Sequence, residues 1–209
     1  MRISRFIYTA LVPAFMAVAF SFTMKGQNAD AVISRINAKA ATIKTIEADF
    51  TQEKDLSILN DKMVSKGKMY YDKGMLRWEY TSQYSYLFIM NGEKVLLQSS
   101  TSTTTGDVAS NRIYRMIARI MVDTITGKSL DGGGDFAVKM ETSSKGNVAV
   151  LTPLKREIKS MFKEVRLHFD DSDCVSKIEL VEGTGDKTVI SLSGVKYNAP
   201  VSASLFEVK

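Results

Sequence analysis

Cysteine and histidine are nearly absent from this chain of 209 residues, which contains one of each. The single cysteine, Cys174, excludes an intrachain disulfide, and it lies far from the N-terminal position at which an exported protein would carry a lipid. We expect Cys174 to be a small residue at the start of a strand. The histidine, His168, alternates with apolar residues in VRLHF, which predicts a solvent-facing strand position rather than a catalytic one.

Sequence motifs of nucleotide, metal and hydrolase chemistry are also missing. The chain contains no G-x-S-x-G, H-E-x-x-H, P-loop or C-x-x-C pattern. The acidic turn at 170–173 lacks the further ligands of a calcium loop, and the glycines at 132–134 neither follow a strand nor open a helix. We therefore expect a protein that is not an enzyme, with no catalytic residue, no cofactor and no metal site.

A large charge of one sign is lacking as well. The first 27 residues hold three of the 28 basic residues and none of the 23 acidic ones, which leaves 25 basic against 23 acidic side chains in the rest. This balance does not indicate nucleic-acid binding.

The N-terminus has the pattern of a targeting segment. Arg2 and Arg5 precede an apolar run over 6–22, which is typical of a secretory signal peptide, while a membrane anchor is the alternative because the run approaches a spanning length. We predict a signal peptide over residues 1–27, cleaved between Gly26 and Asp30. Residues 28–209 are then expected to form a single domain.

Two segments have helical periodicity. Residues 28–44 place apolar side chains at helical spacing, and Asn28 or Asp30 can cap the start of this helix. A second helix is predicted over 110–127, with an apolar face opposite a row of arginines.

The remaining segments alternate with a period of two and predict antiparallel strands. Asn91 and Gly92 form a strong hairpin signal, whereas the polar segment 100–107 reads as a loop. Strands are predicted over 45–58, 63–72, 75–80, two segments within 81–97, 135–142, 147–154, 161–170, 175–183, 186–197 and 203–209. The fold class is therefore mainly β with helices (α+β), and a sheet of ten to eleven strands should curl into a barrel or half-barrel closed on one side by the helices.

The segment 81–97 is apolar on both faces. Tyr84, Tyr86, Phe88 and Met90 share one parity, whereas Leu87 and Ile89 occupy the other. Helices could cover one face while a sheet edge or a dimer partner covers the other. Alternatively, the strands line an apolar concavity that takes an apolar ligand.

Five segments follow one another along the chain: ADFTQEK, SKGKMYYDKGMLRWEY, YLFIMNGEKVLL, LTPLKREIKSMFKEVRLHFD and VKYNAPVSASLFEV. Together they resemble the periplasmic outer-membrane lipoprotein carrier family (LolA-like). The resemblance covers essentially all of residues 28–209. It implies a monomeric, unclosed antiparallel half-barrel with a helical lid over an apolar cavity. It also implies a periplasmic carrier, or chaperone, that accepts acylated lipoproteins from an inner-membrane ABC transporter and delivers them to an outer-membrane acceptor or to the outer membrane itself.

The carrier hypothesis assigns residues to a cavity and to a lid. The acyl-chain cavity would be lined by Phe50, Met69, Tyr71, Leu76, Trp78, Tyr80, Leu87, Ile89, Met90 and Leu97. The lid would present Ile113, Met116, Ile117, Ile120 and Met121.

The sequence departs from the family in one motif. Where the family carries Lys-Arg-Pro, whose arginine helps to hold the lid shut, this chain has Tyr71, Asp72 and Lys73, followed by Gly74. Lys73 is the candidate charge for lid control, although a lysine lacks the planar fork of an arginine.

A second hypothesis needs no ligand. The chain could be a secreted β-rich interaction module that dimerises through its apolar strands. Such a module would bury these strands on association, and its monomer would bind no hydrophobic probe.

Overall fold

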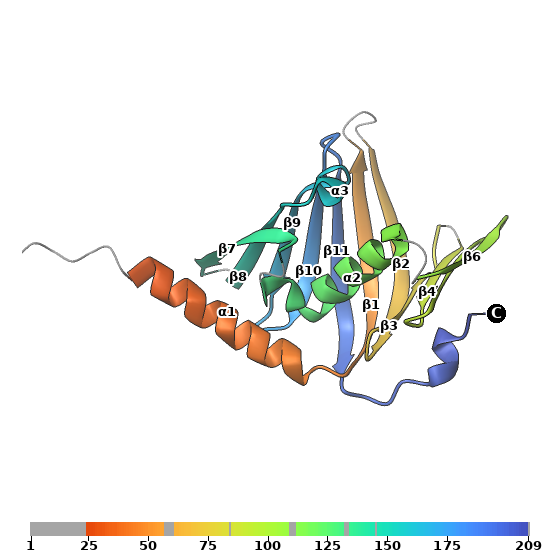
Figure 1. The fold of residues 1–209 in the computed structure, drawn as a ribbon, viewed down its shortest axis with the longest axis horizontal. Helices are drawn as coiled ribbons and strands as arrows, with labels where there is room; N and C mark the ends of the chain where they lie inside the picture. The colour runs from red at the N-terminus through yellow and green to blue at the C-terminus, as the bar shows by residue number, and fades with distance from the viewer. Residues whose placement is uncertain are drawn as a thin grey trace, which may run out of the picture.

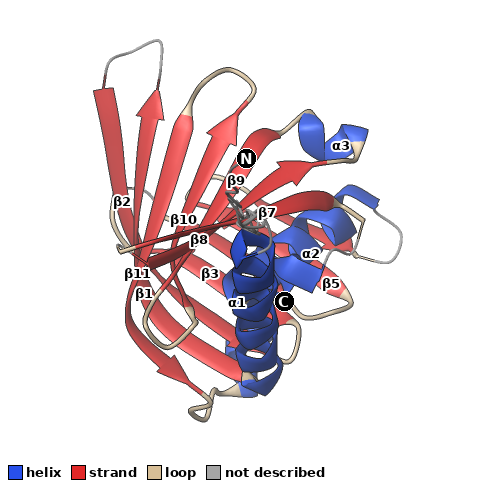
Figure 2. Cartoon of the chain, turned by 90° about the vertical axis from the view of Figure 1, so that its left-hand side faces the viewer, coloured by secondary structure: helices blue, strands red, loops and turns tan. Residues whose placement is uncertain are grey.

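Strands are the main secondary structure of the protein, which was analysed as a computed structural model. The structure describes residues 24–56, 61–83, 85–108, 112–131, 134–144 and 146–208. Within these residues, eleven antiparallel strands form one sheet that curls without closing, and the helices lie on its open side (Figures 1 and 2). The predicted fold class, an unclosed half-barrel with helices, is confirmed. The predicted signal peptide falls almost entirely outside the described residues and stays a prediction.

The chain order explains how the half-barrel is built. The strand order is β6-β5-β4-β3-β2-β1-β11-β10-β9-β8-β7, so the two edge strands, β6 and β7, follow each other in sequence. The connection between them must therefore cross from one edge to the other, and it contains helix α2. The strands are β1 Thr45–Leu56, β2 Asp61–Asp72, β3 Met75–Tyr80, β4 Tyr86–Met90, β5 Lys94–Ser99, β6 Thr103–Asp107, β7 Phe136–Ser143, β8 Gly146–Pro153, β9 Phe162–Phe169, β10 Val175–Glu182 and β11 Lys187–Tyr197.

The helices differ in length and in role. The longest, α1, packs against the sheet through Val32, Ile36 and Ala40, and Arg35 donates two hydrogen bonds to Asp173 in the turn between β9 and β10. The predicted caps are wrong, because α1 begins at Met24 and so Asn28 lies inside it. The helices are α1 Met24–Thr42, α2 Arg112–Thr126 and α3 Arg156–Lys159, with 3₁₀ turns η1 Lys128–Asp131 and η2 Ala203–Phe206.

Two segments have a different secondary structure from the one predicted. The polar segment 100–107, predicted to be a loop, contains the edge strand β6, which pairs with β5. Its side chains are mostly exposed on both faces, so it shows no apolar alternation. Conversely, 203–209 was predicted to be a strand and contains η2, from which Phe206 is buried. Both predictions are wrong.

Each face of β3–β5 has its own apolar cluster. On the inner face, Leu76, Trp78 and Phe88 belong to the main core beneath the helices. On the outer face, Ile89 and Leu96 pack against Phe206 in the C-terminal segment, which lies beside β3 and β4 (Figure 1). The apolar character of both faces of 81–97 is thus explained by a core on one side and the chain's own C-terminus on the other.

The outer face of β9–β11 carries a cluster of charges instead. Glu179 on β10 is nearly buried, and its carboxylate lies 2.6 Å from Lys187 Nζ, 3.0 Å from Lys177 Nζ and 2.9 Å from His168 Nε2. Burial alone would raise the pKa of Glu179, but the two lysines outweigh it and lower the pKa to about 2. Burial and the neighbouring Lys177 lower the pKa of His168.

We expect Glu179→Gln to lower the free energy of unfolding at pH 7 by about 2–3 kcal/mol, because one pKa unit corresponds to about 1.4 kcal/mol. The folded pKa of about 2 lies below the unfolded value. The stabilisation is therefore complete above the unfolded pKa and is lost as the pH falls towards 2. Urea unfolding at several pH values measures it. The control is Glu182→Gln, whose carboxylate makes a half-exposed ion pair with Lys54 at 3.2 Å and contributes at most about 1 kcal/mol. A difference between Glu179→Gln and wild type that stays constant down to pH 2 would contradict this account.

Candidate functional site

An apolar pocket of about 440 Å³ lies between the concave face of the sheet and α2. None of the described residues that line it carries a charge, and their polar side-chain groups are the amide of Gln52, the indole N–H of Trp78 and a few hydroxyls. The lining residues are Gln52, Trp78, Tyr80, Tyr86, Phe88, Leu97, Ile120, Met121, Thr124, Ile125, Met161, Phe162, Ile178, Leu180 and Ile190. A cavity of this size and polarity suits an apolar ligand, since ligand pockets span roughly 300–1,000 Å³.

Aromatic side chains form one wall of the pocket. The ring of Phe50 stacks on Trp78 with centroids 4.1 Å apart, and it meets Tyr80 edge-on at 5.2 Å. Tyr80 in turn lies edge-on to Tyr86 at 6.1 Å, and its hydroxyl donates a hydrogen bond of 2.8 Å to Gln52 Oε1. These contacts fix the ring orientations, so the wall is rigid and offers aromatic surface rather than hydrogen-bonding groups.

Gly67 on β2 makes this aromatic arrangement sterically feasible. Gly67 pairs with Phe50 on β1 and with Tyr80 on β3. A Cβ atom at Gly67 would lie 2.3 Å from Cζ of Phe50 and 2.1 Å from the backbone oxygen of Glu79. The Phe50 ring therefore fills the space that any side chain at position 67 would need.

The predicted cavity residues on the inner face divide into two groups. Trp78, Tyr80 and Leu97 line the pocket, and Phe50 supports Trp78 by stacking on it. The others belong to the same inner face but are packed into the core without lining the open volume: Met69, Tyr71, Leu76 and Met90. The pocket thus occupies the part of the concave face beyond a filled core.

The structure does not place Leu87 and Ile89 in the pocket. Both lie on the outer face of β4, where they pack in the cluster around Phe206. Their inclusion in the cavity was wrong, because successive strand residues point to opposite faces and Phe88 between them takes the inner one.

Helix α2 supplies the side of the pocket that faces the sheet. Ile120 and Met121, two of the predicted lid residues, line the pocket, together with Thr124 and Ile125. The side chains of the other three predicted lid residues, Ile113, Met116 and Ile117, lie outside the described residues.

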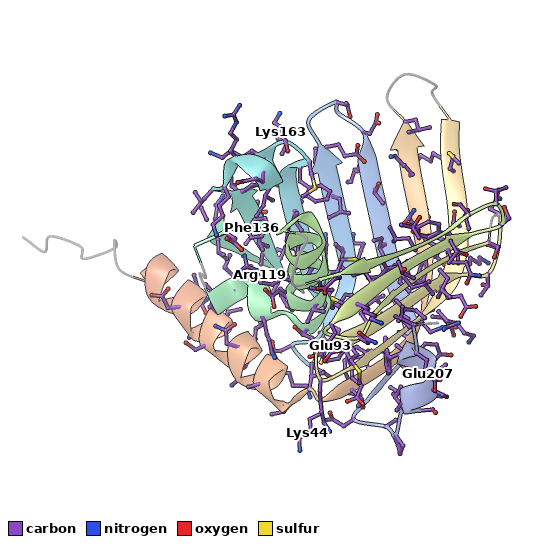
Figure 3. All side chains as sticks on the ribbon, turned by 45° about the vertical axis from the view of Figure 1, so that its right-hand side comes forward. Lys44, Glu93, Arg119, Phe136, Lys163 and Glu207 are labelled. Carbon is purple, nitrogen blue, oxygen red and sulfur yellow. The ribbon has the colours of Figure 1, made fainter. Side chains whose placement is uncertain are left out.

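Ionic contacts tie α2 to the far end of the sheet. Arg119 on α2 (labelled in Figure 3) forms an ion pair with Asp135, which lies just before β7 and is buried. Lys155, between β8 and α3, approaches the same carboxylate to 2.5 Å. By contrast, Lys73 is exposed in the β2–β3 turn, and its ammonium makes no ion pair with a described residue. Its role in lid control stays a prediction.

Some lining residues were missed by the sequence analysis. Ile178 and Ile190 pair with each other across β10 and β11, so strand alternation could have identified them. Phe162 could not be found in this way. The pairing of β9 with β10 shifts register between Val181 and Glu182, next to Phe162, and this irregularity allows Phe162 to face inward although the buried residues of β9 have the opposite parity.

The fold and the site together define a class of protein. It is an open antiparallel half-barrel whose uncharged apolar pocket lies under a crossing helix. A family model described as the outer membrane lipoprotein carrier protein LolA matches residues 41–209, and the chain belongs to this family. The resemblance inferred from the sequence is confirmed.

Two sequence relatives of similar length carry the same description. An outer-membrane lipoprotein carrier protein of Nitrosospira multiformis is 25% identical over 171 residues, covering 78% of this chain and 77% of that protein. One of Azotobacter vinelandii is 23% identical over 194 residues, covering 92% and 90%. Among solved structures, a LolA superfamily protein of Nitrosomonas europaea aligns with a TM-score of 0.45 at 11% identity, over 86% of this chain and 97% of that one.

The described residues contain neither a membrane-spanning helix nor a cluster of metal ligands. None of their helices is long and apolar enough to cross a membrane. Their acidic, histidine and cysteine side chains nowhere gather in a group of three that could hold a metal ion.

Proposed function

We propose that the protein is a periplasmic carrier whose pocket holds acyl chains of lipoproteins on their way from the inner to the outer membrane. The observation that carries this proposal is the uncharged pocket between the aromatic wall and α2, in a chain of the lipoprotein carrier family. The donor would be a lipoprotein-releasing ABC transporter of the inner membrane. The recipient would be an outer-membrane acceptor or the membrane itself.

The hydrophobic effect supplies the energy for such a role. Each methylene group removed from water contributes roughly 0.8 kcal/mol, so an acyl chain of a dozen methylenes contributes on the order of 10 kcal/mol. The pocket offers apolar walls for this burial and only a few polar groups. Because apolar contact is not directional, a pocket of this kind can accept chains of different lipoproteins and release them to another apolar environment.

The lining also favours binding over catalysis. Among the described lining residues there is no carboxylate, imidazole, thiol or amine that could act as an acid, base or nucleophile.

The burial of the strands weakens the dimer hypothesis. The two faces of β3–β5 are covered by the core and by the C-terminal segment of the same chain. These strands therefore leave little apolar surface for a second copy.

Titration with a fluorescent fatty-acid probe tests the proposal. The protein should be a monomer that binds the probe at one-to-one stoichiometry. A synthetic acylated lipoprotein N-terminus should displace the probe, and the same peptide without its acyl chains should not. A dimer that binds no probe, or displacement by both peptides alike, would refute the proposal.

A further inference from the structure

A basic surface segment follows β8 and leads into β9. It spans 154–163, includes α3, and carries one acidic residue, Glu157, against four exposed basic ones. We call these four residues the basic rim: Lys155, Arg156, Lys159 and Lys163.

The basic rim concentrates the positive charge of the chain. With Glu157 it has a formal charge of +3, whereas residues 28–209 as a whole carry only 25 basic against 23 acidic residues. Lys155 is engaged with Asp135. Arg156, Lys159 and Lys163 make no ion pair with any other residue in the described part of the chain, unlike Lys54 and many other lysines. Their charges are therefore available to an external partner.

The same segment exposes an apolar residue among these charges. The side chain of Leu154 is 51% exposed, and it directly precedes Lys155. Ile158, within α3, is fully buried and anchors the short helix to the sheet. The buried anchor holds the neighbouring basic side chains and Leu154 outward, which presents charge and apolar surface together.

The basic rim adjoins the pocket. Met161 and Phe162, which follow α3, both line the pocket, and Lys163 comes next. Figure 3 shows Lys163 beside α3 and Lys44 at the opposite end of the molecule. A surface bound by the basic rim would thus lie close to the end of the pocket lined by Met161 and Phe162.

We propose that the basic rim docks the protein on an anionic lipid bilayer, so that acyl chains pass between the pocket and the membrane over a short distance. This inference rests on the proposed function of the pocket. An anionic bilayer fits better than an acidic protein, because an exposed leucine among long basic side chains can enter the interfacial region while the charges stay at the headgroups. Each basic residue near an anionic membrane strengthens binding by roughly fivefold.

Vesicle co-sedimentation of the exported protein tests this proposal. The vesicles are phosphatidylcholine alone, or phosphatidylcholine with about a third phosphatidylglycerol. The wild type should bind the anionic vesicles and not the neutral ones, and added salt should weaken binding. Arg156→Gln, Lys159→Gln and Lys163→Gln combined should reduce the affinity on the order of 100-fold. The matched control, Lys44→Gln, Lys66→Gln and Lys94→Gln, removes the same charge elsewhere and should bind nearly as wild type.

Several outcomes would overturn the proposal. Equal binding to both vesicle types, or equal losses in the rim variant and the control, would show that the basic rim is not the docking surface. If the rim variant blocks lipoprotein delivery while the wild type does not bind anionic vesicles, the surface serves a protein partner instead. Probe binding to the pocket separates the two proposals, since the rim variant should keep it. Failure of the wild type to bind the probe would refute the pocket's function and leave the vesicle result standing.

Discussion

Leu180→Glu is expected to weaken binding of a fatty-acid probe by about 100-fold or more. Leu180 lines the pocket from β10, and its side chain is only partly buried, so a carboxylate there can remain hydrated while the pocket is empty. A bound acyl chain would displace that water. Leaving a charged group poorly solvated against hydrocarbon costs several kcal/mol, and about 3 kcal/mol corresponds to a loss of more than 100-fold in affinity.

The adjacent residue provides a matched control for this variant. Val181 is also partly buried on β10, but it points to the opposite face of the sheet because successive strand residues alternate. Val181→Glu should therefore bind the probe with nearly the wild-type affinity. Fluorescence titration measures the binding, and thermal unfolding confirms that both variants are folded. Equal affinities for the two variants would mean that the pocket is not the binding site.

Phe206→Ala is expected to lower the free energy of unfolding by about 3–5 kcal/mol, which is the range for large buried aromatic residues. Phe206 is only 2% exposed, and it fills the outer-face cluster with Ile89 and Leu96. Its removal leaves a cavity between η2 and β4, so the C-terminal segment loses its anchor.

Urea unfolding measures this loss, with Ser204→Ala as the control in the same 3₁₀ turn. Ser204 is exposed, and its replacement should change the free energy of unfolding by no more than about 0.5 kcal/mol. Under conditions where Phe206→Ala is folded, its affinity for the fatty-acid probe should match the wild type, because Phe206 lies on the face opposite the pocket. A loss of stability below about 1 kcal/mol would show that the C-terminal segment does not cover the outer face in solution.

The strands that could be predicted from sequence are those with one buried face. In β3 the alternation of Leu76, Trp78 and Tyr80 fixed both the limits of the strand and the face that turns inward. The edge strand β6 escaped prediction because no sheet or core covers it, so its threonines need no alternation. The C-terminal segment 203–209 was wrongly predicted to be a strand, because Phe206 and Val208 alternate like strand residues. In the structure they pack as a 3₁₀ turn and its extension.

The pocket could be predicted only in part, for reasons of tertiary structure. The part of the aromatic wall made by Phe50, Trp78 and Tyr80 followed from residues that alternate on β1 and β3, whereas Tyr86 on β4 was missed. The lining of the pocket by Phe162 depends on a register shift beside this residue, which no local sequence pattern indicates. Leu87 and Ile89 were misassigned because the sequence does not reveal that a segment more than 100 residues later covers them. Likewise, the contact of Arg119 with Asp135 arises only after α2 has crossed the open side of the half-barrel.

Native mass spectrometry of the exported protein, isolated gently from cells that produce lipoproteins, tests the central claim most directly. The account predicts a population of monomers that carry one acylated lipoprotein or lipid each, and it predicts that Leu180→Glu isolated in the same way is largely empty. A bare, homogeneous dimer in wild type would contradict it, because the apolar strands would then be covered by a second copy of the chain rather than by cargo.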